Sequence, residues 1–484
     1  MTAATSPAAT HGAAATPMAG PIDARTRMLL EAPIGPTILR LAWPNVLVML
    51  AHTAAGLIET WFVGRLGTDA LAGMALVFPG MMLMQMLSAG SVGGGIMSAT
   101  ARFLGRGDRA GAEAVLVNAL LINAALGLLF TVGVLLFGRP LYAALGGRGG
   151  ALEAALAYSD IVFGGGIFLW LMNAFASSVR GTGNMLVPAL VICGGVVLLV
   201  PLSPLLIFGW GPVPGLGIAG GGIALLAFYF GGTIILALYC LRHGTVRLRA
   251  IAPSWPMSRE ILRVGAFSAI SSVQTNLVIG CATALAGAYG GTAAVAGYGT
   301  GARLEYLLVP LVFGIGSPLV AMIGTSAGAG RADRALSCAA WGGGLALALT
   351  GTIGAVAALA PEAWIRLFDQ DPAVIAAGSA YLRTAGPFYG FFGLGLALYF
   401  ACQGAGRLWW PLFAGFVRMA IALGGGWAAL SWTGSFAGFS AAIGLGMLAY
   451  GGITTFAVWR GGVFGPRPAG RAAAPALAGV RPAP

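Results

Sequence analysis

The sequence contains no lysine, so all 26 of its Lys-plus-Arg residues are arginines. A chain without lysine has neither a phosphate-binding loop of the G-x-x-x-x-G-K type nor a lysine Schiff base. Its three histidines, His11, His52 and His243, are too far apart for an H-E-x-x-H zinc motif. The five cysteines form no C-x-x-C pair and lie in apolar stretches, as buried thiols do. We therefore expect no bound metal, no cofactor and no ATP motor of this kind.

Charge is also scarce. Only 8% of the 484 residues are charged and 58% are hydrophobic, whereas about a quarter of a typical soluble domain is charged. A soluble globule needs more charge to cover its surface, so the composition predicts an all-α polytopic membrane protein with transmembrane helices of roughly 20 apolar residues. The twelve candidate spans are 37–62, 71–97, 113–138, 153–177, 185–208, 216–241, 260–286, 294–323, 336–360, 374–401, 408–430 and 434–459.

The distribution of the arginines explains the net charge of +12. If the N-terminus is cytoplasmic, nineteen arginines fall on its side, four on the opposite side and three within spans. This positive-inside pattern predicts a multi-pass protein of the plasma membrane with both termini in the cytoplasm. Arginines on that side are expected to touch anionic lipid headgroups, so membrane lipid is the expected partner and nucleic acid is not.

The chain matches itself at a spacing near 223 residues. The matching segments are 38–40 with 261–263, 67–73 with 291–297, 105–110 with 330–335, and 181–183 with 404–406. Each repeat holds six spans, so both halves enter the membrane in the same direction, and such parallel repeats are related by a pseudo-twofold axis along the membrane normal. The repeat predicts two six-helix lobes with a substrate cavity between them. The expected divisions are a disordered cytoplasmic tail (1–36), an N-lobe (37–241), a cytoplasmic linker (242–259), a C-lobe (260–459) and a second cytoplasmic tail (460–484).

Residues 35–460 resemble the multidrug and toxic compound extrusion (MATE) transporters. The stretch 44–72 is similar to the first-helix signature of that family, segments 181–184 and 403–407 to two of its connections, and Arg303-Leu304-Glu305 to a pattern of many bacterial members. The resemblance implies a secondary efflux transporter and no enzyme activity. It further implies export of amphipathic, cationic small molecules in antiport with H⁺ or Na⁺, by alternating access of the two lobes.

The chain departs from the family pattern at residues expected to bind the coupling ion. Glu59 occupies the position of the usual aspartate in the first helix, and Leu199 and Ser203 replace an asparagine and an aspartate that many members carry in the fifth. The missing carboxylate favours the proton as coupling ion. An ionisable side chain within a span costs roughly 2.5–3.5 kcal/mol on insertion, so Glu59 is the main ion-coupling candidate; a glutamate wetted at the outer interface is the alternative.

Two further residues of the first span accompany Glu59. His52 lies on the same helical face two turns earlier and can relay a proton, or serve in helix packing. Pro44 removes a backbone donor and is expected to bend this helix.

Polar residues in other spans are candidates for the substrate cavity, with hydrogen bonding between helices as the alternative role. They are Asp160, Gln85, Asn173, Gln274, Asn276, Arg303, Glu305 and Arg383. The repeat aligns Asp160 with Arg383, so both would face a shared cleft if they point inward. Glu305 needs a cationic partner, such as Arg383 or Arg418, and a structural salt bridge is the favoured interpretation.

Two other functions are compatible with this organisation. One is a lipid-linked oligosaccharide flippase of the same superfamily, whose cavity should be more basic. The other, an integral membrane transferase, would need a carboxylate or histidine constellation that the sequence does not display. A monomer suffices for a cavity between two lobes.

Overall fold

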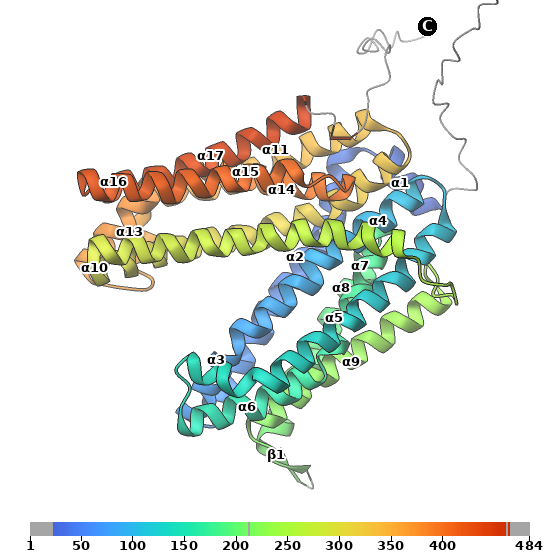
Figure 1. Ribbon diagram of the computed structural model, residues 1–484, viewed down its shortest axis with the longest axis horizontal. Coiled ribbons are helices and arrows are strands. Elements are labelled where there is room, and N and C mark those ends of the chain that lie inside the picture. The colour runs from blue at the N-terminus through green and yellow to red at the C-terminus, as the bar shows by residue number, and fades with distance from the viewer. Residues whose placement is uncertain (1–22, 212, 461–462, 465–484) are drawn as a thin grey trace, which may run out of the picture.

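The computed structural model describes residues 23–211, 213–460 and 463–464. Within these ranges the chain consists of helices, their connections and one short hairpin, in which β1 (Gly209–Trp210) pairs antiparallel with β2 (Val213–Pro214). Two helix bundles converge at one end of the molecule and diverge toward the other (Figure 1). The all-α, two-lobe fold class predicted from the sequence is confirmed.

The N-lobe, coloured blue to green in Figure 1, holds the first six spans. Its helices are α2 (Ile34–Gly64), α3 (Thr68–Gln85), η1 (Met86–Val92), α4 (Gly93–Gly105), α5 (Arg109–Ala144), α6 (Gly149–Gly164), α7 (Gly166–Gly181), α8 (Leu186–Phe208) and α9 (Ile218–Arg242). The segments α3, η1 and α4 follow one another as a single span, with a π-helical segment of 7 residues in its middle. The fourth span is α6 and α7 together, bent by 44°.

The C-lobe, coloured yellow to red, holds the other six spans. Its helices are α10 (Trp255–Gly328), α11 (Ala332–Leu359), α12 (Pro361–Ile365), α13 (Pro372–Ala385), η2 (Gly386–Phe388), α14 (Tyr389–Ala405), α15 (Trp409–Met419), η3 (Ala420–Gly425), α16 (Gly426–Thr433) and α17 (Phe436–Arg460). The 74 residues of α10 are two spans, because Gly291 breaks the helix with a φ of 66°. Division at Gly291 and the bent α6–α7 pair give the twelve expected spans.

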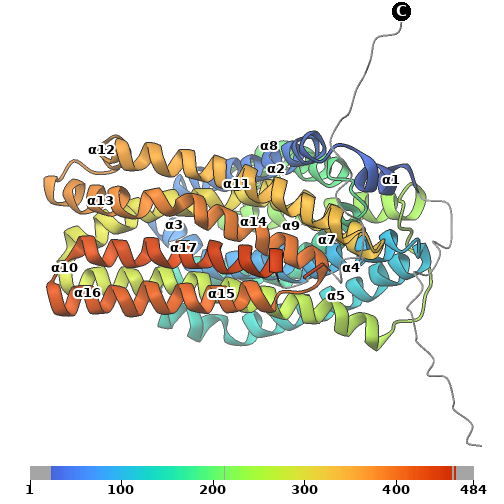
Figure 2. The same cartoon turned by 90° about the horizontal axis from the view of Figure 1, so that it is seen from above.

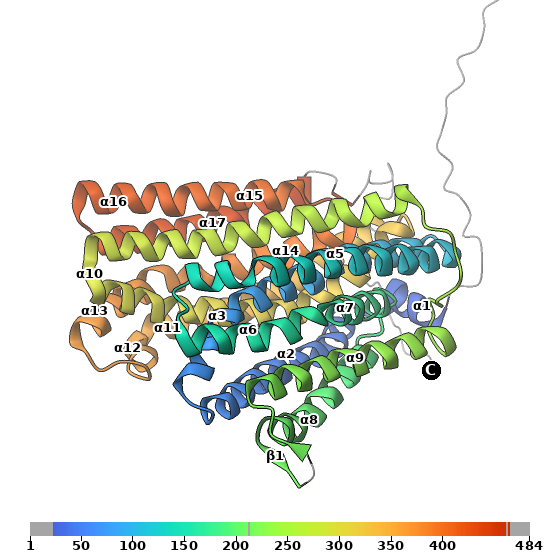
Figure 3. The ribbon, with the colours of Figure 1, turned by 60° about the horizontal axis from the view of Figure 1, so that its bottom comes forward.

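Views from other directions show how the lobes are arranged. Seen from above, the helices of the two bundles overlap in projection (Figure 2), although the bundles diverge in Figure 1. The ends of α10 and α16 that carry their labels lie opposite to α1 (Ala24–Glu31) (Figures 2 and 3). Four connections lie at the converging end: 105–109, 242–255, 328–332 and 405–409. The turn in the middle of α10 and the β1–β2 hairpin lie at the diverging end (Figure 1).

The N-terminal tail is shorter than the sequence suggested. Residues 24–31 of the predicted disordered segment form α1 (Ala24–Glu31), which buries Leu29 and Leu30. The helix is held in place because Arg331 donates to the carbonyl of Leu30 at 3.1 Å and Arg334 to that of Leu29 at 2.9 Å. The remaining parts of both predicted tails, 1–22, 461–462 and 465–484, lie outside the described residues.

The backbone itself carries the internal repeat. Gly67 (φ 117°) and Gly291 (φ 66°) occupy matching turns in the left-handed region, as do Gly183 (φ 81°) and Gly406 (φ 72°). The predicted match of 105–110 with 330–335 is wrong by two residues. α4 ends at residue 105 and α10 at residue 328, so the structural spacing at this turn is 223.

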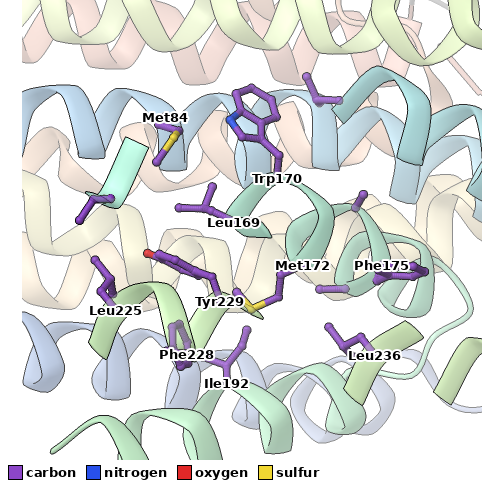
Figure 4. Close-up of a cluster of buried hydrophobic side chains, with 14 of the residues drawn as sticks. Met84, Leu169, Trp170, Met172, Phe175, Ile192, Leu225, Phe228, Tyr229 and Leu236 are labelled. Atoms are coloured by element: carbon purple, nitrogen blue, oxygen red, sulfur yellow. The ribbon is translucent and has the colours of Figure 1, made fainter. Parts of the chain in front are cut away.

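Each lobe has its own buried core. In the N-lobe, one buried cluster contains Met84 of α3, Trp170 and Phe175 of α7, Ile192 of α8 and Phe228 of α9 (Figure 4). A separate cluster fills the outer part of the C-lobe, and another joins α1, α2, α4 and α10 near the converging end. The lobes are thus independently packed bodies that share one apolar contact region.

Candidate functional site

The two lobes meet most tightly where α4 packs against both halves of α10. A methyl group on Gly105 would collide with the carbonyl of Thr325, and one on Gly328 would collide with the carbonyl of Arg102. A shift of 223 residues turns Gly105 into Gly328 and Arg102 into Thr325, so each contact is the repeat counterpart of the other. This reciprocity is expected for an interface on a pseudo-twofold axis. Small residues allow this close approach of backbones, so the converging end is closed.

Polar contacts reinforce this closed end. Arg102 of α4 forms an ion pair with Glu260 of α10, with Nη2 and Oε1 2.7 Å apart. Its Nη1 donates to the carbonyl of Gly404 at 3.1 Å and also contacts Ser98. Arg102 therefore links α4 of the N-lobe to two elements of the C-lobe.

A small crevice of about 20 Å³ lies between the lobes, beside this interface. Most of its lining residues form pairs at a spacing of 223 residues: Gly90 with Phe313, Gly94 with Ser317, Met97 with Val320, Ser177 with Phe400, and Arg180 with Gln403. The crevice therefore lies on the pseudo-twofold axis, at the base of the space from which the lobes diverge. Its volume suffices for about one water-sized group.

The two long polar side chains of the crevice, Arg180 and Gln403, differ in their bonding. Gln403 donates to the hydroxyl of Ser268 at 2.9 Å. Arg180 is only 6% exposed, and its Nε has no hydrogen-bond partner. Within the described ranges no carboxylate pairs with Arg180, so a buried positive charge faces the crevice uncompensated.

Glu59 is enclosed within the N-lobe. It is 6% exposed, and its Oε1 accepts a hydrogen bond of 3.2 Å from the hydroxyl of Tyr158 on α6. Gly221 of α9 lies beside the carboxyl, since a Cβ there would be in ordinary van der Waals contact with Oε1 at 3.5 Å. Among the described residues Glu59 has no ion-pair partner. The predicted coupling candidate is thus a buried carboxyl bonded to a phenol and to no cation.

Glu305 of the C-lobe is also a buried carboxyl beside a tyrosine, although the repeat aligns it with Met82 and not with Glu59. Tyr381, which corresponds to Tyr158 in the repeat, lies with its hydroxyl 3.4 Å from Oε2 of Glu305. Here, however, Arg418 of α15 lies 2.6 Å from Oε1, and both side chains are almost completely buried. Of the two cations considered for Glu305, the structure provides Arg418. An ion pair of Glu305 is what the interpretation favoured from the sequence requires, and the structural role of this pair stays a prediction.

The structure does not bring Asp160 and Arg383 together. Arg383 lies 3.7 Å from Glu362 in an exposed pair at the α11–α13 connection, and Asp160 is exposed on α6. Arg303 stacks at 5.3 Å on Phe368 of the same connection. None of these three predicted cavity residues lines the crevice.

The predicted amide residues mostly bond between or within helices. Asn173 donates to Ser88 at 2.7 Å, and Asn276 donates to a carbonyl of its own helix. Gln85 and Gln274 each have one buried polar atom without a partner. Among the predicted amides, Gln85 and Gln274 thus have a buried polar atom that a ligand could use.

The remaining candidates lie on α2. His52 is half-buried, and the described residues offer its ring no hydrogen bond. Pro44 lies inside α2 without breaking it, since one helix extends from Ile34 to Gly64.

Sequence reasoning missed Arg102 and Arg180, which it counted with the arginines of the cytoplasmic side. A signal was available for Arg180, because aligning Gly181 with Gly404 places it opposite Gln403 on the repeat axis. Arg102 has no comparable signal, since its bond to Glu260 joins helices from different lobes.

Comparison with known proteins identifies the family. The family model described as MatE matches residues 44–205 and 268–428, one segment in each lobe. The chain is 30% identical over 379 residues to the probable multidrug resistance protein NorM of Deinococcus radiodurans, covering 72% of this chain and 78% of that protein. It is 28% identical over 379 residues to the FAD transporter of Shewanella oneidensis, covering 77% and 82%.

Solved structures show the same fold. A crystal structure of MATE in the bent conformation superposes with a TM-score of 0.83 at 23% identity, over 91% of this chain and 97% of that one. An outward-facing MATE family transporter gives a TM-score of 0.80 at 23% identity, over 91% and 98%. Because the family model covers more than half of the sequence, the chain belongs to the MatE family, the multidrug and toxic compound extrusion transporters, and is a multi-pass membrane transporter and not an enzyme.

Proposed function

We propose that the protein exports amphipathic small molecules in exchange for protons, with Glu59 as the group that binds and releases the coupling proton. The observation that carries the proposal is the burial of Glu59 with a tyrosine as its hydrogen-bond partner and no cation beside it. A carboxylate removed from water without a cation is costly, and one proton removes the charge. The occupancy of that proton can therefore change the packing of α2.

Comparison with the C-lobe supports the assignment. The carboxylate of Glu305 is neutralised by Arg418 at 2.6 Å, so it does not need a proton to be buried. Leu199, in place of a polar fifth-helix residue, leaves fewer oxygen ligands for Na⁺ in the N-lobe. The proton is accordingly the proposed coupling ion, and Na⁺ is the alternative.

The arrangement of the lobes supports transport by alternating access. They are closed at the end formed by α4 and α10 and diverge at the other (Figure 1). The positive-inside rule assigns the closed end, where the connections carry most of the arginines, to the cytoplasm. We propose a location in the bacterial inner membrane with both termini cytoplasmic, and release of substrate from the diverging end.

Two classes of substrate, which differ in the sign of their charge, are candidates. The family resemblance suggests cationic compounds. Arg180, however, is the charged residue of the crevice, and a buried positive charge repels cations. This observation favours a second candidate, amphipathic organic anions, which agrees with the FAD transporter name of the Shewanella oneidensis relative, since FAD is an aromatic anion.

The test replaces Glu59 with glutamine, which keeps the shape of the side chain and removes its titration. Proteoliposomes would be loaded with a fluorescent substrate, and efflux would be driven separately by a pH gradient and by a sodium gradient. We expect E59Q to lose pH-driven efflux by at least tenfold while its thermal unfolding stays close to that of the wild type. The matched control is E153Q, because Glu153 is an exposed glutamate of the same lobe.

Two results would contradict the proposal. Full pH-driven efflux by E59Q would remove Glu59 from the coupling mechanism. Efflux by the wild type under a sodium gradient, but not under a pH gradient, would replace the proton with Na⁺.

A further inference from the structure

A second cavity lies at the converging end and is distinct from the crevice on the axis. Its volume is about 700 Å³, and it opens between α4, the start of α10 and the α14–α15 connection. Five arginines line it, with Glu260 as the only carboxylate among its lining residues. The arginines are Arg102, Arg106, Arg259, Arg263 and Arg407.

Two of the arginines of this cavity have no carboxylate partner among the described residues. Glu260 is already bonded to Arg102. In the described part of the chain the side chains of Arg259 and Arg263 have no ion pair, and they stand four residues apart on the same face of α10. Like charges at this spacing destabilise a helix, so an anion placed between them is favourable.

Aromatic residues place the cavity at the membrane surface. Trp409 and Trp410, at the start of α15, form part of its rim, and Trp409 is 65% exposed. Tryptophans concentrate at the boundary between headgroups and acyl chains. Val264, Phe267 and Leu408 give the same cavity an apolar side. A basic cavity with an apolar wall at this depth matches a ligand with a phosphate head and hydrocarbon chains.

We propose that this cavity binds the phosphate headgroup of an anionic phospholipid of the cytoplasmic leaflet. Arg259 and Arg263 hold the phosphate, and the tryptophan rim lies against the upper acyl chains. Because Arg102 and Arg106 belong to the N-lobe and the other three arginines to the C-lobe, the bound lipid joins the two lobes at their closed end.

The test measures lipid retention by the full-length protein. Purified protein in detergent would be titrated with dioleoyl phosphatidylglycerol, and bound lipid would be counted by native mass spectrometry. Dioleoyl phosphatidylcholine has the same chains without net charge, and glycerol 3-phosphate is the free anionic head. We expect phosphatidylglycerol to bind at least tenfold more tightly than either.

The main variant is R259Q/R263Q. Each arginine near an anionic lipid contributes on the order of 1 kcal/mol, so its affinity for phosphatidylglycerol should fall about thirtyfold. A second variant, R106Q, removes a charge from the other lobe and should lose about fivefold. The matched control is R40Q/R242Q, which neutralises two exposed arginines at the same end of the molecule but outside the cavity, and it should stay within twofold of the wild type.

The lipid titrations can contradict the proposed lipid site in three ways. Undiminished phosphatidylglycerol retention by R259Q/R263Q, or an equal loss in R40Q/R242Q, would overturn the proposal. Displacement of the lipid by an equal concentration of glycerol 3-phosphate would also overturn it, because the cavity would then be a site for soluble anions. None of these readouts involves transport, so they stand apart from the assignment of Glu59.

Discussion

Separating Glu305 from Arg418 gives the sharpest test of how the two lobes differ. The Nη2–Oε1 distance is 2.6 Å, and the exposed fractions of the two side chains are 5% for arginine and 3% for glutamate. The guanidinium also stacks at 4.7 Å on Phe392, and the other carboxylate oxygen is 3.4 Å from the hydroxyl of Tyr381. In E305Q the charge of Arg418 stays buried without its carboxylate.

The expected magnitude follows from that burial. Removing one partner of a buried ion pair costs about 3–5 kcal/mol, whereas replacing both partners with uncharged groups is often neutral. We therefore expect E305Q to lose roughly 3–5 kcal/mol of unfolding free energy, and the double variant E305Q/R418M to recover at least about 2 kcal/mol of that loss. The double variant should also keep pH-driven efflux, since this pair is predicted to be structural and Glu59 is the proposed coupling group.

The assay is equilibrium unfolding in mixed micelles, analysed as a double-mutant cycle. The matched control is E362Q, because Glu362 forms an exposed pair with Arg366 at 3.1 Å and exposed pairs contribute less than about 1 kcal/mol. A cost for E305Q no greater than that for E362Q would refute the energetic reasoning. Loss of pH-driven efflux in a stable double variant would refute the structural role.

Two further predictions concern the axis between the lobes. Gly105→Ala or Gly328→Ala should open the closed end, because the added methyl group meets a backbone carbonyl and destabilises the closed packing by about 1–3 kcal/mol. Labelling from the cytoplasmic side of a cysteine introduced in the crevice should then increase at least fivefold. An increase of the same size in Gly344→Ala, whose Cβ would meet nothing within 4 Å, would contradict this. R180Q gives Arg180 the residue type of its repeat counterpart Gln403. It should lower efflux of an anionic substrate such as FAD more than tenfold, while efflux of a cationic dye is kept or increased. Equal losses for both compounds would count against a role of Arg180 in charge selection.

The spans were predictable from the sequence because each requires one long apolar segment with a polar or glycine-containing boundary. The predicted span 185–208 coincides with α8 to within one residue, and the boundary between 286 and 294 contains Gly291. The short helix α1 was not predictable in this way. Its eight residues contain several charges, and it is ordered by the side chains of Arg331 and Arg334, which are distant in sequence.

The site was predictable where a single helix or the repeat carried the signal. Glu59 stands out as a carboxyl within an apolar span, and its burial follows from that position. The choice of Arg418 over Arg383 for Glu305 depends on how α15 packs against α10, which no local pattern encodes. The role of Arg102 was also not predictable from a local pattern, because its partner Glu260 comes from the other lobe.

Helix α2 connects the proposed proton site to the other lobe. Near its outer end Glu59 contacts Tyr158, within the N-lobe. Nearer its start, Val46 packs against Gly314 of α10, so the same helix also contacts the C-lobe. Pro44 lies two residues from that contact and leaves one carbonyl of the helix without its usual donor, which makes bending easiest there. A change in packing around Glu59 therefore acts on α2, which already contacts the C-lobe. The proton accordingly needs no second titrating site in the C-lobe to move the lobes against each other.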